Sequence, residues 1–205
     1  MFRRAEFRLA SCLLLLLAVA GLVHPAQAQF RGGYAFLQAV ENRDGTKATE
    51  ALKGDPSFVN TRNPDTGETA LIIVAKRRDI SWLRFLLAKG ADPSIGDRQE
   101  VTPLMHTALI NFTDGAEELL DRKAPVDQTN RRGETALILA VQTRNVAMVR
   151  LLVKRGANPD KADHIAGMSA RDYAKRDNRT PGLAEALDAA KPAAKPTGPV
   201  QGPVF

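Results

Sequence analysis

One short motif recurs along this chain at a nearly constant spacing, and that spacing limits the fold more than any other feature. Residues 67–75 read GETALIIVA and residues 133–141 read GETALILAV. The hydroxyl residue of the motif recurs at intervals of 33, 33 and 34 residues, as Thr69, Thr102, Thr135 and Ser169. A fixed period of this length is typical of a protein built from stacked repeats.

The second half of each unit repeats as well. Residues 82–93 read WLRFLLAKGADP and residues 148–159 read MVRLLVKRGANP. A middle copy occupies residues 116–125, where Lys123 replaces the glycine. The leucines and valines of these segments have helical spacing, so each copy predicts an amphipathic helix. A helix of this size cannot bury its apolar face alone, and stability therefore comes from contact between units.

The ends of the predicted helices carry matching signals. A threonine such as Thr102 is a good N-cap because its hydroxyl accepts a hydrogen bond from an unpaired backbone amide. Pro103 follows at the first helical position, where its missing amide does no harm. Gly90 and Gly156 end the second helix in a left-handed conformation that glycine tolerates. Each period thus predicts a pair of short helices followed by a loop.

With these motifs the chain resembles the ankyrin-repeat family. The resemblance implies an all-α solenoid of about five helix-turn-helix repeats with short loop or β-turn fingers. The repeat domain then covers residues 29–190, with the three middle repeats clear and the two flanking ones degenerate. The expected repeats are approximately residues 34–62, 63–95, 96–128, 129–161 and 162–190.

The two ends of the repeat region differ from the middle. Residues 36–40 begin a helix that is similar to the first helix of a repeat, and residues 46–54 stand in place of the usual second helix. Leu183 and Leu187 provide an inner contact for the last repeat, which is otherwise polar, as a capping repeat should be. Residues 191–205 are rich in proline and glycine without periodicity and are expected to be a disordered tail.

Residues 1–28 have the pattern of a secretory signal peptide. Three arginines precede an apolar run over residues 9–23, and residues 26–28 read AQA, which predicts cleavage after Ala28. The alternative is an uncleaved membrane anchor, but the run is shorter than the roughly 20 residues that a spanning helix needs. Cys12 is the only cysteine and lies early in the apolar run, so we interpret its match to a lipoprotein signal as chance.

Cleavage would leave a protein located in the periplasm or secreted, without a stable membrane anchor. The remaining chain has no cysteine, and removal of three arginines and Glu6 lowers the formal net charge from +6 to +4. That mild charge does not favour nucleic acid as a partner. The absence of disulfides favours a bacterial periplasm, although residues 111–113 and 178–180 fit the glycosylation pattern of a eukaryotic secreted protein.

The motifs of enzymes are missing from the sequence. His106 and His164 lack a partner at metal-binding spacing, and no nucleophile elbow or phosphate-binding loop occurs. The neighbouring carboxylates at positions 97 and 100 and at positions 117 and 118 are interpreted as solvated side chains. We therefore expect no catalytic residues, no bound metal and no cofactor.

The resemblance also implies a concave binding surface made by the loop tips and the first helices. The partner-binding residues carried over to these positions are Asp65, Thr66, Glu68, Lys76, Arg77, Arg98, Gln99, Val101, Leu109, Ile110, Arg131, Arg132, Glu134, Gln142 and Thr143. With Arg78 the basic members form a stripe, and Leu109 and Ile110 lie near its centre with Phe112 beyond. An apolar centre with an arginine rim is the expected anatomy of a protein-binding patch.

An alternative interpretation of this surface remains open. The charges can serve solubility alone, and Leu109 and Ile110 can pack inward if the third repeat is distorted. Glu100 occupies the position of Gly67 and Gly133, which predicts an unusual finger in that repeat.

The function predicted from the sequence is a monomeric, non-enzymatic interaction module in the periplasm of a Gram-negative bacterium. Its partner would be another exported protein with an acidic or amphipathic surface. Two alternatives are an accessory or chaperone-like factor for an exported enzyme, for example in oxidative-stress defence, and a cell-envelope hydrolase, which the missing catalytic motifs disfavour.

Overall fold

A computed structural model of the chain describes residues 25–177 and 179–188, with side chains from Arg31 onward. These residues form helices and turns and contain no strand; two isolated antiparallel bridges join Arg62 to Thr69 and Ala162 to Ser169. The expected all-α class is therefore confirmed. The chain divides into two compact units, one ending at Phe58 and one beginning at Val59, and each is described by itself.

The first unit contains two packed helices, α2 (Pro25–Glu41) and α3 (Gly45–Gly54). Arg43 makes the turn between them with a φ of 57°, and the side chain of Asp44 caps α3 by accepting from the amide of Lys47 at 3.0 Å. The interpretation of residues 46–54 as a replacement for the second helix was wrong, because the segment forms that helix itself. A 3-10 helix, η1 (Pro56–Asn60), follows.

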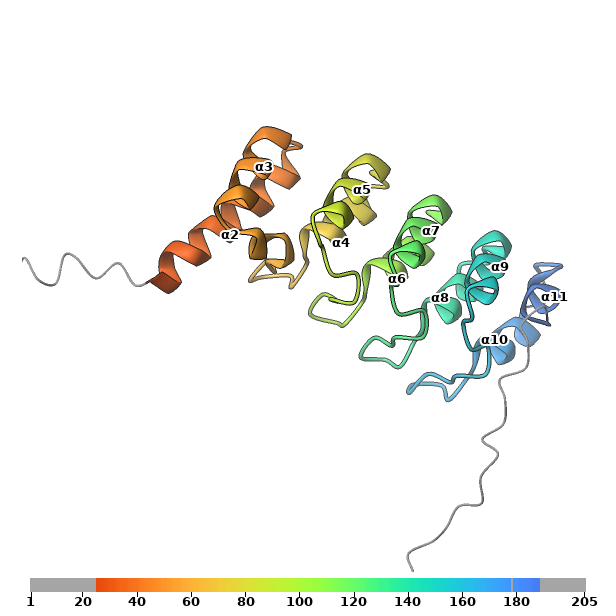
Figure 1. The fold of residues 1–205 in the computed structure, drawn as a ribbon. Coiled ribbons are helices and arrows are strands. Elements are labelled where there is room, and N and C mark those ends of the chain that lie inside the picture. Colours follow the sequence, from red (N-terminus) through yellow and green to blue (C-terminus); the bar gives the residue numbers. More distant parts are fainter. Residues whose placement is uncertain (1–24, 178, 189–205) are drawn as a thin grey trace, which may run out of the picture. The chain divides into compact units, whose positions relative to one another are not determined.

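The second unit is a series of four helical pairs joined by loops (Figure 1). The pairs are α4 (Ala70–Lys76) with α5 (Ile80–Ala88), α6 (Pro103–Leu109) with α7 (Thr113–Asp121), α8 (Ala136–Gln142) with α9 (Val146–Lys154), and α10 (Ala170–Arg176) with α11 (Leu183–Asp188). Each pair recurs at the period of the sequence motif. The loops that lead into the first helix of each pair project on one side of the unit, as Figure 1 shows.

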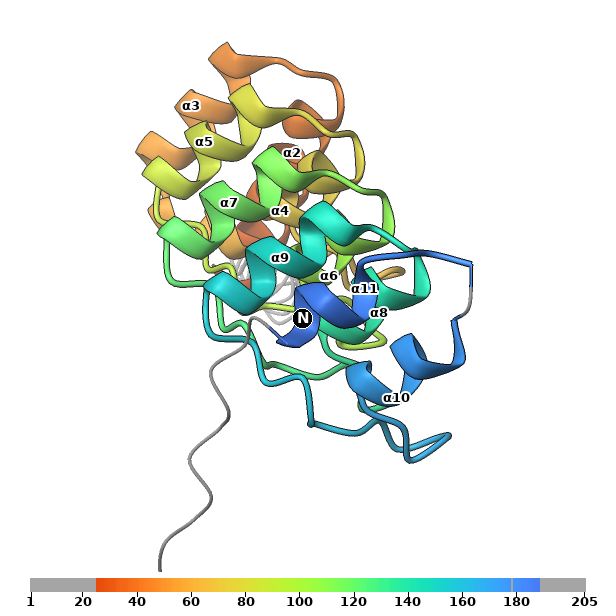
Figure 2. The same ribbon diagram turned by 90° about the vertical axis from the view of Figure 1, so that its right-hand side faces the viewer.

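The helices of this unit lie in two rows (Figure 2). We call α4, α6, α8 and α10 the inner row, in which each helix packs against the next. We call α5, α7, α9 and α11 the outer row, which is continuous in the same way. Stacking in both rows buries apolar side chains at the interfaces; those in the outer row include Leu83, Leu86, Leu119 and Leu152, none of which is exposed. Burial of a leucine contributes about 2 kcal/mol, so the interfaces supply the stability that single pairs lack.

The predicted caps begin every helix of the inner row. The hydroxyl oxygens of Thr69, Thr102 and Thr135 accept hydrogen bonds from the amides three residues later, at 3.4, 3.3 and 3.2 Å. Ser169 does the same for α10 at 3.3 Å. Caps of this kind stabilise a helix by about 1 kcal/mol each. The repeated hydroxyl residue is thus the starting signal of each inner helix.

The structure describes only part of the two predicted end segments. Most of the expected signal peptide and all of the expected tail, residues 191–205, lie outside the described residues. Helix α2 includes the last four residues of the expected signal peptide. In the described ranges, no helix has both the length and the apolar character needed to cross a membrane. At the other end, Leu183 and Leu187 are buried as predicted.

Candidate partner-binding site

The loops before the inner helices are locked to one another by backbone hydrogen bonds. We call residues 62–69, 97–102, 130–135 and 163–169 the first to fourth fingers. The carbonyl of Thr66 accepts from the amide of Arg98 at 3.1 Å, and the carbonyl of Gln99 accepts from the amide of Arg131 at 3.0 Å. The carbonyl of Arg132 accepts from the amide of His164 at 2.8 Å. The fingers therefore form one continuous ledge beside the inner row.

The closeness of neighbouring fingers explains the glycine of the repeated motif. Gly133 has a φ of +78°, and a Cβ there would lie 2.6 Å from the backbone nitrogen of His164. Glu100 holds the same position in the second finger and keeps the left-handed conformation, with a φ of 62°. The second finger therefore keeps the left-handed turn of the others, and its unusual feature is the strain of a side chain at this position.

Most charges of the predicted basic stripe have partners within the protein. Lys76 Nζ lies 2.6 Å from Glu68 Oε1, which holds the two predicted residues together. The guanidinium groups of Arg131 and Arg132 lie 3.7 Å from Glu100 and 3.6 Å from Glu134. Arg131 and Arg132 remain well exposed, so these two pairs are weak. Three of the six charges of the stripe thus lie near carboxylates.

Two further arginines of the stripe bind backbone carbonyls of neighbouring repeats. Arg98 Nη2 donates to the carbonyl of Pro64, and Arg78 Nη1 donates to the carbonyl of Ile110 at 3.3 Å. The Arg78 guanidinium also lies over the ring of Phe112, 5.6 Å from its centroid. Phe112 is buried beneath it, so the prediction that this ring extends the exposed patch was wrong.

The apolar centre of the predicted patch is divided between surface and interior. Leu109 is 42% exposed at the end of α6, as the binding interpretation requires. Ile110, the C-cap of α6, is half-buried, which agrees in part with the alternative of inward packing. One exposed leucine therefore remains at the centre of the predicted patch.

Leu109 forms part of the wall of a cavity between the second and third repeats of this unit. We call this space of about 500 Å³ the α6–α8 cavity. Its lining residues are Gln99, Val101, Leu109, Asn130, Arg132, Glu134, Leu139 and Gln142. Six of the predicted partner-binding residues meet here, and three apolar side chains face five polar ones. Such a mixture suits a partially apolar segment of another protein.

Glu134 lines this cavity but is not the exposed residue that we predicted. Only 6% of it is accessible, because the third finger folds around it. Asn130 Nδ2 donates to Glu134 Oε2 at 2.9 Å, and Asn130 Oδ1 accepts from the amides of Glu134 and Arg132 at 3.0 and 2.9 Å. Glu134 is therefore a structural anchor of the finger whose carboxylate lies at the cavity wall.

The remaining predicted residues lie outside this cavity. Asp65 and Thr66 are exposed on the first finger, while Arg77, the C-cap of α4, is half-buried. Thr143 is also half-buried, and its hydroxyl lies 2.9 Å from the carbonyl of Leu139 and 3.3 Å from that of Ala108. Thr143 therefore links α8 to α6 and is not free to bind a partner.

His106 is also committed to the fold. Its Nε2 lies 3.2 Å from Asp97 Oδ2, while Asp97 Oδ1 accepts from the amides of Gln99 and Val101 at 2.8 and 3.0 Å. Burial lowers the pKa of His106, and the contact with Asp97 opposes this only in part. The neutral imidazole thus helps to hold the second finger in place through Asp97.

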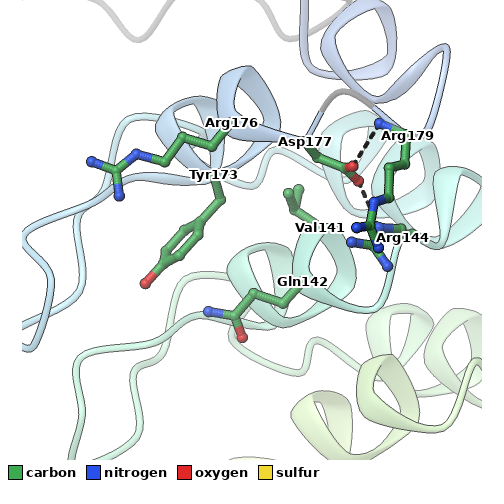
Figure 3. A pocket seen from close by; sticks show the side chains of 7 residues that line it. All are labelled: Val141, Gln142, Arg144, Tyr173, Arg176, Asp177 and Arg179. Atoms are coloured by element: carbon green, nitrogen blue, oxygen red, sulfur yellow. Dashed lines mark hydrogen bonds and ion pairs between the residues drawn. The ribbon is translucent and has the colours of Figure 1, made fainter.

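A second cavity lies one repeat further along and was largely missed by the sequence analysis. We call this space of about 440 Å³ the α8–α10 cavity (Figure 3). Its lining residues are Val141, Gln142, Arg144, Tyr173, Arg176, Asp177 and Arg179. Only Gln142, which lines both cavities, was predicted. Both cavities lie along the inner row and within one compact unit.

The sequence did contain a signal for this second cavity. Arg176 lies seven residues after Ser169, which is the position of Leu109 and Gln142 relative to Thr102 and Thr135. Extending the assignment of exposed positions into the last repeat would have identified Arg176 as a candidate binding residue. The groups that each arginine contacts in the folded protein could not have been predicted from these positions.

The aromatic ring of this cavity is fixed by a buried carboxylate. The hydroxyl of Tyr173 donates to Asp163 Oδ2 at 2.6 Å, and this hydrogen bond raises the pKa of Tyr173. Burial raises the pKa of Asp163, but the hydrogen bond from Tyr173 and those from the amides of Ala166 and Ile165 outweigh it, so that the pKa is lowered. The fourth finger is thereby held to α10.

Comparison with curated proteins finds relatives that share part of this chain. A putative ankyrin repeat-containing protein of Treponema pallidum (strain Nichols) is 37% identical over 122 residues, which are 59% of this chain and 41% of that protein. Mitochondrial disaggregase from Bos taurus is 30% identical over 164 residues, 78% of this chain and 24% of that protein. Transient receptor potential cation channel subfamily A member 1 from Homo sapiens is 31% identical over 101 residues, 48% of this chain and 9% of that protein.

The chain thus spans less than half the length of these relatives. A family model described as "Ankyrin repeats (3 copies)" matches residues 36–129 and 83–163, which together exceed half of the chain. The match agrees with the stacked helical pairs and confirms the solenoid that the resemblance implied. It also indicates a protein–protein interaction module, since that is the role of such repeats. The chain belongs to the ankyrin-repeat family.

Proposed function

We propose that this chain is a non-enzymatic protein-binding module whose partner docks on the fingers and the inner row, with the α6–α8 cavity at its centre. The observation that carries the proposal is the position of Leu109. This side chain is 42% exposed at the wall of a cavity of about 500 Å³, which Leu139 and Arg132 also line. Apolar anchors within a polar rim dominate the binding energy of protein interfaces.

The rigidity of the ledge supports the same role. Fingers that are joined by backbone hydrogen bonds and anchored by Asn130 and Asp97 lose little conformational entropy when a partner binds. The proposal assigns no catalytic role to His106, because its carboxylate partner Asp97 is occupied in holding the second finger. The inner face therefore serves as a preformed recognition surface.

The proposed module acts outside the cytoplasm, on another exported protein. Support for this location comes from the sequence of residues 1–28, with its arginines, apolar run and small residues before the expected cut after Ala28. The intact mass of the protein recovered from cells tests it. A mass that begins at Gln29, in the periplasmic or extracellular fraction, supports export, whereas a full-length protein in the cytoplasm contradicts it.

Binding is tested by placing a photo-crosslinking amino acid at Gln142, which is exposed between the two cavities. The matched control places it at Arg150, which is exposed on the outer helix of the same repeat. A discrete crosslinked partner at Gln142 that is absent at Arg150 supports the proposal. Equal crosslinking at the two positions, or crosslinking at Arg150 alone, would contradict a binding role for the inner row.

A further inference from the structure

The α8–α10 cavity concentrates positive charge that the fold does not neutralise. Its lining has three arginines and one carboxylate. That carboxylate, Asp177, accepts from Arg144 Nε at 2.9 Å, from the amide of Arg179 at 2.9 Å and from the hydroxyl of Thr180 at 3.0 Å. The amide of Arg179 makes the largest contribution to lowering the pKa of Asp177. Asp177 is therefore ionised at neutral pH and already occupied.

The side chains of Arg176 and Arg179 have no comparable partner. Neither guanidinium forms an ion pair within the described ranges, and both residues are exposed. Arg176 acts on Asp172 through its charge, which is a minor cause of the lowered pKa of that carboxyl. The two guanidinium groups thus keep donors that a ligand can use.

The groups that surround the cavity come from both of its sides. Figure 3 shows Arg176 and Tyr173 extending from α10 on one side, with Gln142 of α8 opposite Tyr173. Arg144 and Arg179 lie together at the other end of the cavity, beside Asp177. A space of about 440 Å³ is large enough for a carboxylate side chain together with part of its backbone.

The arginines of the cavity could have a structural role in place of a ligand-binding one. Cations near the carboxyl end of a helix are stabilised by the helix dipole, and Arg176 is the last residue of α10. That effect explains Arg176 but not Arg179, which lies beyond the helix and still lines the same cavity. The pairing of Arg144 with Asp177 likewise leaves the other two charges uncompensated.

We infer that the α8–α10 cavity binds an acidic side chain, Asp or Glu, on an extended segment of the protein partner. This inference rests on the proposed function, because the same segment occupies the α6–α8 cavity. Gln142 lines both cavities, so the two spaces are neighbours along the inner row. Guanidinium groups bind carboxylates through charge-assisted hydrogen bonds, which gives the second cavity its selectivity.

The distance between repeats sets the spacing that the partner must have. Packed helices lie roughly 9 Å apart, and an extended chain advances roughly 3.3 Å per residue. An apolar side chain in the α6–α8 cavity and an acidic one in the α8–α10 cavity, which are one repeat apart, are then separated by about three residues. The partner motif is therefore an extended segment with an apolar and an acidic residue at that separation.

Selection of phage-displayed random nine-residue peptides on the purified protein tests this inference. The test variant is R176Q/R179Q, and the matched control is R122Q/R150Q, which removes the same charge from exposed positions in the turn after α7 and on α9. We expect the wild type and the control to enrich an apolar residue and an acidic residue about three positions apart. We expect the test variant to keep the apolar preference and lose the acidic one.

Affinity measurements on a selected peptide, with its carboxyl terminus amidated, complete the test. We expect R176Q/R179Q to weaken binding about tenfold, and replacement of the acidic residue by its amide to have no further effect on that variant. An unchanged midpoint of thermal unfolding shows that the variant is folded. Retention of the acidic preference by R176Q/R179Q, or apolar enrichment alone on the wild type, overturns the inference. Failure of every variant to enrich peptides overturns the proposed function as well.

Discussion

The fingers and the α8–α10 cavity both carry several arginines, yet the contacts of those arginines differ. On the fingers, Arg98 binds a backbone carbonyl of the preceding finger, and Arg131 and Arg132 face carboxylates. In the cavity, Arg176 and Arg179 form no ion pair within the described residues, and Asp177, the carboxylate of the lining, already accepts hydrogen bonds from Arg144 and from the amide of Arg179. The number of arginines on a surface therefore says little about the charge available to a partner, because local pairing decides it.

The two cavities differ in chemistry for the same reason. The α6–α8 cavity presents Leu109 and Leu139 between polar groups that are largely satisfied within the third finger. The α8–α10 cavity presents arginines beside one aromatic ring. The first suits an apolar anchor and the second suits an anion, so neighbouring repeats of one design recognise different features.

The largest expected effect comes from the third finger, which shapes the α6–α8 cavity. Gly133→Ala places a methyl group 2.6 Å from the backbone of His164 in a left-handed conformation, and should destabilise the protein by about 3 kcal/mol. The control is Gly156→Ala, where φ is +90° but no atom lies within 4 Å, with an expected loss of about 1 kcal/mol. Urea unfolding measures both, and equal losses would show that close packing between fingers is unimportant.

The next largest effect concerns the anchor of the α6–α8 cavity. Leu109→Asp should reduce crosslinking of the partner at Gln142 at least tenfold, because a charged group in the apolar part of the cavity must be desolvated. The melting temperature should change little, since the leucine is 42% exposed in the free protein. Ile165→Asp is the control, as this exposed isoleucine lies outside both cavities. If Leu109→Asp gives the same yield of crosslinked partner as the wild type, Leu109 is not part of the binding site.

A smaller effect is expected where a glutamate replaces the glycine of the motif. Glu100→Gly should stabilise the protein by about 1 kcal/mol, because glycine adopts a φ of 62° without steric strain. Glu100→Gln keeps the Cβ and loses only the exposed contact with Arg131, so its stability should stay near that of the wild type. If the two variants are equally stable in urea, backbone strain is not the cause.

The smallest effect should come from the arginines of the fingers. Arg131→Gln with Arg132→Gln should weaken binding of a selected peptide by less than about threefold, because both guanidinium groups already lie near carboxylates. The comparison is R176Q/R179Q, for which we expect about tenfold. A larger loss from the finger variant than from the cavity variant would reverse the contrast between the two surfaces.

Several features of the fold could be predicted from particular residues. The hydroxyl residues at 69, 102, 135 and 169 begin the inner helices, because a cap acts on amides only two or three positions away. The glycines at 67 and 133 mark finger turns for a local reason as well, namely the positive φ that those turns require. Local interactions of this kind depend on sequence order alone.

Other features could not be predicted in this way. The burial of Glu134 was not predicted, because it depends on how the third finger folds to bring Asn130, four residues earlier, against the carboxylate. Phe112 is buried as well, and the guanidinium of Arg78 from the preceding repeat lies over its ring. Glu134 was expected at the surface because the family resemblance implies an exposed position there, and Phe112 was expected beyond Leu109 and Ile110 in the same patch.

By itself, the sequence determined the period, the helical pairs, their caps and membership in the ankyrin-repeat family, because these follow from local patterns that recur every 33 residues. Only the tertiary structure decided which arginines are paired and which remain available. The reason is that their partners lie one repeat away: Arg98 binds Pro64, Arg78 binds Ile110, and Arg144 binds Asp177. Such contacts depend on the stacking of whole repeats and on side-chain directions, which the order of residues does not show.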